Sequence, residues 1–224
     1  MSENTNCGSV FSAALFDFDM TLMDTSYIIT DCTNLLAERF GLRSVTRDEV
    51  LSVIGLEISD SWVSLWGRFE DEWLDYYRKH FRAREQSGFR EFPDTRSAVS
   101  SLRENGVKTG VVSNRHFASA TVKKSGIAHL FDVVVGLEDV RNAKPHPEPI
   151  LTALSRLSSV SNRAFYVGDT DTDMKAAVAS GVTGIGVTTG NYGADALKAA
   201  GAAVSCPNLT CAAGVILKLG GSIG

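Results

Sequence analysis

Two aspartates, Asp17 and Asp19, directly follow an apolar stretch near the start of the chain. The run from Ala13 to Phe16 predicts a buried strand of a parallel sheet, and residues two apart on an extended backbone point the same way. Like charges held this close raise each other's proton affinity or require a cation, so the pair indicates a reactive or metal-binding site. The alternative interpretation is a strand end whose two acidic side chains are simply solvated.

Further polar residues follow later segments that are rich in Val and Ile. These segments predict strands at residues 107–113, 132–136, 164–168 and 183–187. Ligands of an open parallel sheet bind outside the carboxyl ends of its strands. The candidates found there, or in the turn between two such strands, are Ser113, Asn114, Lys144, Asp169 and Asp173. Taken singly, they are also typical of turns, of a solvated lysine and of a helix N-cap, but coincidence explains the whole set poorly.

The chemistry of this set is coherent. Several carboxylates at one sheet edge stay ionised only beside a compensating cation, and oxygen ligands with few histidines suit Mg²⁺. A hydroxyl from Ser113, an amide from Asn114 and the ammonium of Lys144 would supply donors for a tetrahedral anion. Phosphate is the obvious candidate for that anion.

The elements that must position these residues alternate along the chain. Helices are predicted at residues 95–104, 118–125, 148–157, 173–180 and 194–199, followed by a weak strand near 202–205 and a helix near 209–219. Strands alternating with helices imply right-handed crossovers, so the fold class is α/β, a doubly wound parallel sheet of the Rossmann-like type.

The segment between the first two of these strands has a different pattern. It is helix-like from about residue 26 to 86, which predicts a core of residues 10–23 and 91–224 with an inserted helical cap at 24–90. The two connections between these parts favour a hinge. Within 61–81, aromatic residues recur at steps of three and four, which is typical of the buried seam of a helical bundle with one or two members reaching a pocket. A stripe that lines a substrate pocket is the alternative.

Composition limits the function classes. The chain has 224 residues, 44% of them hydrophobic, and a net charge of −4 with no basic run, which argues against nucleic acid as the main partner. No apolar run approaches the roughly 18 residues of a membrane span, and the first ten residues lack the features of a secretory signal. The spacing of the four cysteines favours reduced thiols, so we expect a cytoplasmic protein, and the oligomeric state stays open.

Four short motifs of the chain resemble those of a known family. The sequence DFDMTL at 17–22, the Ser113-Asn114 pair, Lys144 and GDTDTD at 168–173 are similar, in order and rough spacing, to the four motifs of the haloacid dehalogenase superfamily. The resemblance covers residues 13–190, and the helical block looks like the mobile cap of that superfamily. The stretches AKPHPEP, VGDTDTDMKAA and IGVTTGNYG look most like phosphoglycolate phosphatases.

This resemblance implies roles for individual residues. It implies that Asp17 is a nucleophile that forms an aspartyl-phosphate and that Asp19 is the acid/base. It implies that Mg²⁺ is bound by Asp17, the backbone carbonyl of Asp19 and Asp169, with Asp173 as a direct or outer helper. It also implies that phosphate is held by Ser113, Asn114 and Lys144. The family most often has glycine where this chain has Met20, which puts the substrate range in doubt and predicts either altered backbone freedom or a thioether near the active-site entrance.

The expected function is therefore that of a magnesium-dependent phosphatase acting on a small phosphorylated metabolite, with a phosphoglycolate-like phosphomonoester as the best single example. A pyrophosphatase or nucleotide phosphatase of the same superfamily is the alternative. From another class, a non-catalytic phosphoacceptor or binding protein would also place acidic residues and a lysine on such a sheet. A 2-haloacid dehalogenase is disfavoured, because that chemistry needs no metal.

Overall fold

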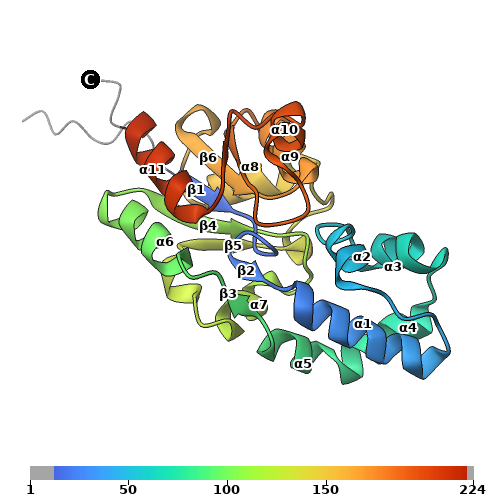
Figure 1. Cartoon of the computed structure of the whole chain (residues 1–224). Coiled ribbons are helices and arrows are strands. Elements are labelled where there is room, and N and C mark those ends of the chain that lie inside the picture. The colour runs from blue at the N-terminus through green and yellow to red at the C-terminus, as the bar shows by residue number, and fades with distance from the viewer. Residues whose placement is uncertain (1–12, 221–224) are drawn as a thin grey trace, which may run out of the picture.

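One parallel sheet forms the centre of the molecule. The computed structural model describes residues 13–220, so the expectations for the first ten residues, for Cys7 and for residues 10–12 of the core lie outside the described part. The strand order is β5-β4-β1-β6-β7-β8 (Figure 1), and every neighbouring pair is parallel. The strands are β1 (Ala13–Phe16), β4 (Lys108–Val112), β5 (Val133–Val135), β6 (Ala164–Gly168), β7 (Thr183–Val187) and β8 (Val204–Cys206). The predicted doubly wound α/β fold is confirmed.

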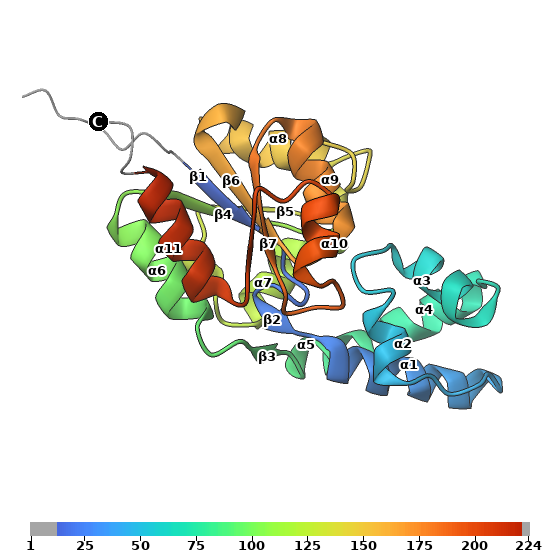
Figure 2. The ribbon, with the colours of Figure 1, turned by 45° about the horizontal axis from the view of Figure 1, so that its top comes forward.

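Helices cover both faces of this sheet (Figures 1 and 2). On one face lie α6 (Thr95–Glu104), α7 (Ala118–Lys124) and α11 (Leu209–Gly220), and on the other lie α8 (Glu148–Arg156), α9 (Asp171–Ser180) and α10 (Ala194–Ala199). Short 3-10 helices occur in the connections at η1 (Ala128–Leu130), η2 (Leu137–Asp139) and η3 (Ser161–Arg163). Alternate residues of β1 point to opposite faces, so Phe16 packs in the core with α6 and Leu15 in the core with α8.

The helical block follows the first strand and packs around a hydrophobic cluster of its own. It consists of α1 (Ser26–Phe40), α2 (Arg47–Leu51), α3 (Ile58–Trp66), α4 (Asp71–His80) and α5 (Arg82–Ser87). At its junction with the sheet, β2 (Met23–Asp24) pairs antiparallel with β3 (Arg90–Glu91). These two-residue strands were not predicted, because so short a segment carries no periodic signal. The division into core and cap at residues 24 and 90 stays a prediction.

The aromatic stripe belongs to two helices instead of one continuous run. Gly67, with φ +76°, ends α3 in the left-handed region that glycine adopts at little cost, and α4 begins at Asp71. Trp62, Trp73 and Tyr77 are buried in the cluster of the helical block, as expected for a seam.

The structure also bears on the expectations about membrane-spanning segments and about the cysteines. None of the helices within residues 13–220 is long and apolar enough to cross a membrane. The cysteines of that range, Cys32, Cys206 and Cys211, are free thiols.

Candidate active site

Lys144 is buried at the end of the sheet and contacts the first aspartate. Asp17 continues directly from β1, and its backbone N–H donates to the Val167 carbonyl at 2.9 Å. The Lys144 Nζ donates to Asp17 Oδ1 at 2.6 Å and to Asp173 Oδ1 at 2.7 Å. Only 5% of Lys144 is exposed, so the interpretation of a solvated surface lysine is wrong. Burial opposes its charge, but the two aspartates raise the pKa of Lys144 above its ordinary value and keep it protonated.

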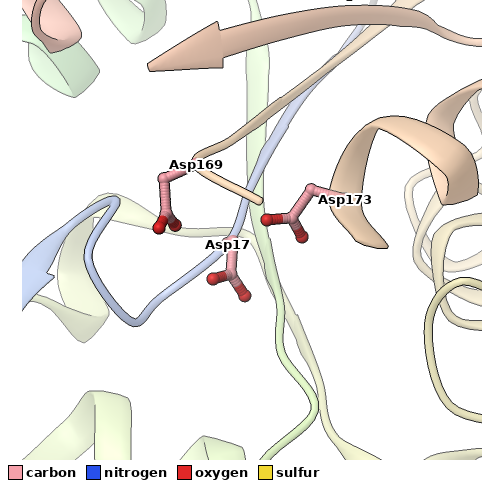
Figure 3. Close-up of side chains that lie close together, drawn as sticks. All are labelled: Asp17, Asp169 and Asp173. Atoms are coloured by element: carbon pink, nitrogen blue, oxygen red, sulfur yellow. The ribbon is translucent and has the colours of Figure 1, made fainter. Parts of the chain in front are cut away.

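Three carboxylates meet beside this lysine. Asp17, Asp169 and Asp173 each offer an oxygen, and these oxygens all lie within 4.8 Å of one another (Figure 3). Asp169 follows β6, and its Oδ1 accepts a hydrogen bond from Thr21 Oγ1 at 2.9 Å. Asp173 lies in the first turn of α9, where its Oδ2 accepts hydrogen bonds from the backbone N–H and the hydroxyl of Thr170. The stretch around Thr170 and Asp173 therefore caps the N-terminus of α9 and also supplies a predicted site residue.

The electrostatics of this cluster favour a cation. Burial raises the pKa of Asp17 to about 7, although Lys144 acts in the opposite direction. Burial, together with the charge of Asp173, also raises the pKa of Asp169 well above its ordinary value. One lysine therefore does not compensate the cluster, and a hard divalent ion with oxygen ligands, such as Mg²⁺, fits this donor set. Gly190 packs closely against Asp169 and limits where its carboxylate can lie, since a Cβ at Gly190 would lie 1.9 Å from Asp169 Oδ2.

Asp19 takes a different set of partners from Asp17. Its carboxylate accepts two hydrogen bonds from the Arg115 guanidinium, both at 2.6 Å, and one from Thr25 Oγ1 at 2.7 Å. Although burial acts to raise it, the Arg115 guanidinium holds the pKa of Asp19 below its ordinary value. The strand ends at Phe16, so the two-residue alternation does not extend to Asp19, and its side chain is not part of the three-carboxylate cluster.

The Ser113-Asn114 pair follows β4, as predicted. Ser113 is buried, and its backbone N–H donates to the Val135 carbonyl at 3.0 Å. The Asn114 side chain clamps the backbone of Lys144: its Oδ1 accepts from the Lys144 N–H at 2.9 Å and its Nδ2 donates to the Lys144 carbonyl at 3.0 Å. The same Nδ2 donates to the Gly55 carbonyl at 3.1 Å, which links this loop to the helical block. Asn114 therefore orients the lysine-bearing turn.

A cavity of about 240 Å³ opens above these residues. Its floor includes Asp17, Asp19, Ser113, Asn114 and Lys144. The opposite wall comes from the helical block and is mostly apolar, with Ile29, Val50, Val53, Ile54, Leu56, Ile58, Trp62, Leu65 and Leu74. Trp62 and Tyr77 of the aromatic stripe reach it, so the expectation that one or two members contact a pocket is confirmed. Arg78 and Arg82 also line it.

Sequence reasoning missed two residues of the candidate site, Tyr166 beside Lys144 and Arg115 beside Asp19. The Tyr166 hydroxyl accepts a hydrogen bond from Lys144 Nζ at 2.8 Å, and its one proton lies within donating distance of both the Val112 carbonyl, at 3.0 Å, and Asp173 Oδ1, at 3.1 Å. The alternation along β6 could have shown that Tyr166 points inward, but not that its hydroxyl contacts the lysine. Arg115 directly follows the quoted Ser113-Asn114 pair, and that position was the only available signal.

Met20 adopts a backbone conformation that favours glycine. Its φ is +53°, and this left-handed region costs a residue with a side chain roughly 1–2 kcal/mol. The Met20 carbonyl accepts a hydrogen bond from Thr189, which helps to hold the turn. The expectation of altered backbone freedom agrees with this strain. The expectation of a thioether at the entrance does not hold, because Met20 is 2% exposed and does not line the cavity.

Comparisons with known proteins agree with this geometry. The model of the family described as "Haloacid dehalogenase-like hydrolase" matches residues 14–187. A pyrophosphatase PpaX of Bacillus pumilus is 30% identical over 191 residues, which cover 84% of this chain and 88% of that protein. A pyrophosphatase PpaX of Anoxybacillus flavithermus is 31% identical over 175 residues, which cover 77% of this chain and 81% of that protein.

Solved structures show the same fold. A predicted phosphatase from Clostridium acetobutylicum has a TM-score of 0.83 at 25% identity, covering 94% of this chain and all of the other. A predicted phosphoglycolate phosphatase from Haemophilus somnus has a TM-score of 0.82 at 20% identity, covering 94% and 98%. With a family model that spans most of the chain and an acidic cluster at the strand ends, the chain belongs to the haloacid dehalogenase-like hydrolases.

Proposed function

We propose that the protein is a magnesium-dependent phosphatase that hydrolyses a small organic phosphomonoester through an aspartyl-phosphate on Asp17. The observation that carries this proposal is the buried group of Asp17, Asp169, Asp173 and Lys144, of which Asp17 and Lys144 line the cavity. In this proposal Mg²⁺ is held by Asp17, Asp169 and the backbone carbonyl of Asp19. When bound, it offsets the negative charge that the carboxylates and the phosphoryl group bring together.

The reaction has two displacements. In the first, a carboxylate oxygen of Asp17 attacks phosphorus, the bond from phosphorus to the leaving oxygen breaks, and the protonated form of Asp19, which the Arg115 guanidinium disfavours, gives that oxygen a proton. In the second, water attacks the phosphorus of the aspartyl-phosphate, Asp19 accepts a proton from the water, and the carboxylate of Asp17 leaves. Ser113 and Lys144 would hold the phosphoryl oxygens, with Lys144 set in place by the Asn114 clamp.

The cavity wall supports an organic leaving group. Apolar side chains predominate on the side contributed by the helical block, and pyrophosphate has no carbon atoms with which to contact them. Burying even two methylene groups against this wall is worth about 1.6 kcal/mol, which corresponds to more than tenfold in kcat/KM. Phosphoglycolate is the first monoester to test, because Arg78 and Arg82 in the same cavity suit a carboxylate near the phosphate.

Pyrophosphate hydrolysis is the second candidate, because the relatives at 30–31% identity are named pyrophosphatase PpaX. A substrate panel separates the two. We expect a longer alkyl phosphate or p-nitrophenyl phosphate to exceed pyrophosphate at least about tenfold in kcat/KM with Mg²⁺, and phosphoglycolate, whose single methylene group is worth about 0.8 kcal/mol, to exceed it about fourfold. We also expect EDTA to abolish turnover of every substrate. Higher kcat/KM for pyrophosphate would favour the second candidate, and no hydrolysis of any substrate would refute both.

A further inference from the structure

Arg115 lies between two buried carboxylates that come from different parts of the fold. Its Nε and Nη2 bind the two oxygens of Asp19, each at 2.6 Å. Its Nη1 donates to Glu85 Oε1 in α5 of the helical block. The other oxygen of Glu85 accepts a hydrogen bond from the Tyr77 hydroxyl at 2.6 Å. One guanidinium therefore joins the acid/base of the proposed reaction to the helical block.

The three charged groups are largely buried, and two aromatic rings pack against the guanidinium. Asp19 and Glu85 are each 7% exposed, and 20% of the Arg115 side chain is exposed. The guanidinium carbon lies 5.2 Å from the ring centre of Phe89 and 5.8 Å from that of Phe18. A two-point bond from a planar guanidinium fixes the plane of a carboxylate as well as its distance. Asp19 is thus oriented by Arg115, and Arg115 is in turn oriented by Glu85.

We propose that Arg115 is a positioning residue for Asp19, and that Glu85 completes this support only while α5 lies against the loop after β4. The inference rests on the proposed function, because it concerns the carboxylate that transfers the proton. Proton transfer requires the carboxylate within hydrogen-bond reach of the leaving oxygen, so a freely rotating Asp19 would lose rate without losing substrate binding. Because Glu85 shares the guanidinium, it also balances the positive charge beside Asp19.

The dependence of rate on the leaving group tests this role. A poor leaving group, such as an alkoxide, needs a proton from Asp19, whereas p-nitrophenolate leaves readily without one. For Arg115→Met we expect kcat/KM to fall about 100-fold with an alkyl phosphate and less than about tenfold with p-nitrophenyl phosphate. Glu85→Gln should show the same selectivity with a smaller loss. Arg156→Met, which removes a surface pair with Asp139, serves as the matched control and should change neither substrate.

Arg115→Lys covers the case in which Arg115→Met does not fold. Lysine keeps the charge between Asp19 and Glu85 but lacks the two-point fork, so the alkyl phosphate should still lose more than p-nitrophenyl phosphate. An equal loss for both substrates in the folded variants, or no loss, would overturn the inference while the proposed function stood. A wild-type protein without magnesium-dependent hydrolysis would overturn the proposed function, and the inference with it.

Discussion

Replacing Lys144 by Met should strongly destabilise the metal-free protein at pH 8. The substitution keeps much of the side-chain volume but removes the cation that lies 2.6 Å from Asp17 and 2.7 Å from Asp173. Breaking a buried pair in this way leaves uncompensated charge, which typically costs about 3–5 kcal/mol of unfolding free energy. For a chain of this size the loss corresponds to a decrease in Tm of roughly 6–20 °C.

Urea unfolding in the presence of EDTA, followed by circular dichroism at pH 8 and pH 5, measures this effect. At pH 5 the loss should be smaller, because burial raises the pKa of Asp17 to about 7 and the carboxyl group can take up a proton in place of the missing cation. Lys175→Met is the matched control. Its pair with Asp171 is an exposed i,i+4 contact on α9, and such pairs contribute about 0.3–0.5 kcal/mol.

The outcome that would refute the reasoning is a loss in Lys144→Met no larger than in Lys175→Met at pH 8. It would mean that Lys144 does not compensate the buried carboxylates. A loss of equal size at both pH values would contradict the charge argument in another way, because a packing defect alone does not depend on protonation. Added Mg²⁺ should recover part of the stability but not the activity, since it supplies charge without replacing the phosphate contact proposed for Lys144.

Three further predictions concern the acidic cluster. Asp17→Asn should abolish turnover of every phosphomonoester, as measured by phosphate release, and substantial residual activity in clean protein would contradict the nucleophile. Gly190→Ala should lower kcat/KM at least about tenfold, because its Cβ would displace Asp169, whereas Gly193→Ala, with nothing within 4 Å, should be neutral in the same assay. Because the folded pKa of Asp17 is raised, its ionisation reduces the stability of the metal-free protein as pH rises from about 4 to about 7. Mg²⁺ at about 100 times its Kd should add about 2.7 kcal/mol to the free energy of unfolding where the carboxylates are ionised. Its effect on Tm in scanning calorimetry should therefore be larger at pH 8 than at pH 5. The reverse order would contradict the proposed metal site.

The sequence predicted the part of this site that depends on strand ends. Asp17, Ser113 and Asp169 each follow an apolar strand, and the topology of a parallel sheet brings such positions to one edge. The burial of Lys144 was harder to foresee, since a lysine directly before a Pro-His-Pro turn is also typical of a surface loop. Its burial depends on Asp173 and Tyr166, which approach from another helix and strand.

The contacts between the helical block and the sheet could not be predicted in the same way. Glu85 and Arg115 are thirty positions apart and share no periodicity, and their contact depends on how α5 packs against the loop after β4. The aromatic stripe was predicted as a buried seam, but Gly67 breaks it into two helices. This break changes which face of each helix meets the cavity, and periodicity alone does not fix that orientation.

The position of β1 in the middle of the sheet also has a consequence for biosynthesis. This strand leaves the ribosome before its partners β4 and β6, which follow only after roughly a hundred and a hundred and fifty further residues, as the pairing of Ala13 with Lys108 and Ala164 shows. Until then its apolar side chains and free backbone groups are exposed to association with other chains. The nascent protein should therefore depend on a chaperone or on early collapse of the helical block, and expression at lower temperature should raise the yield of folded protein.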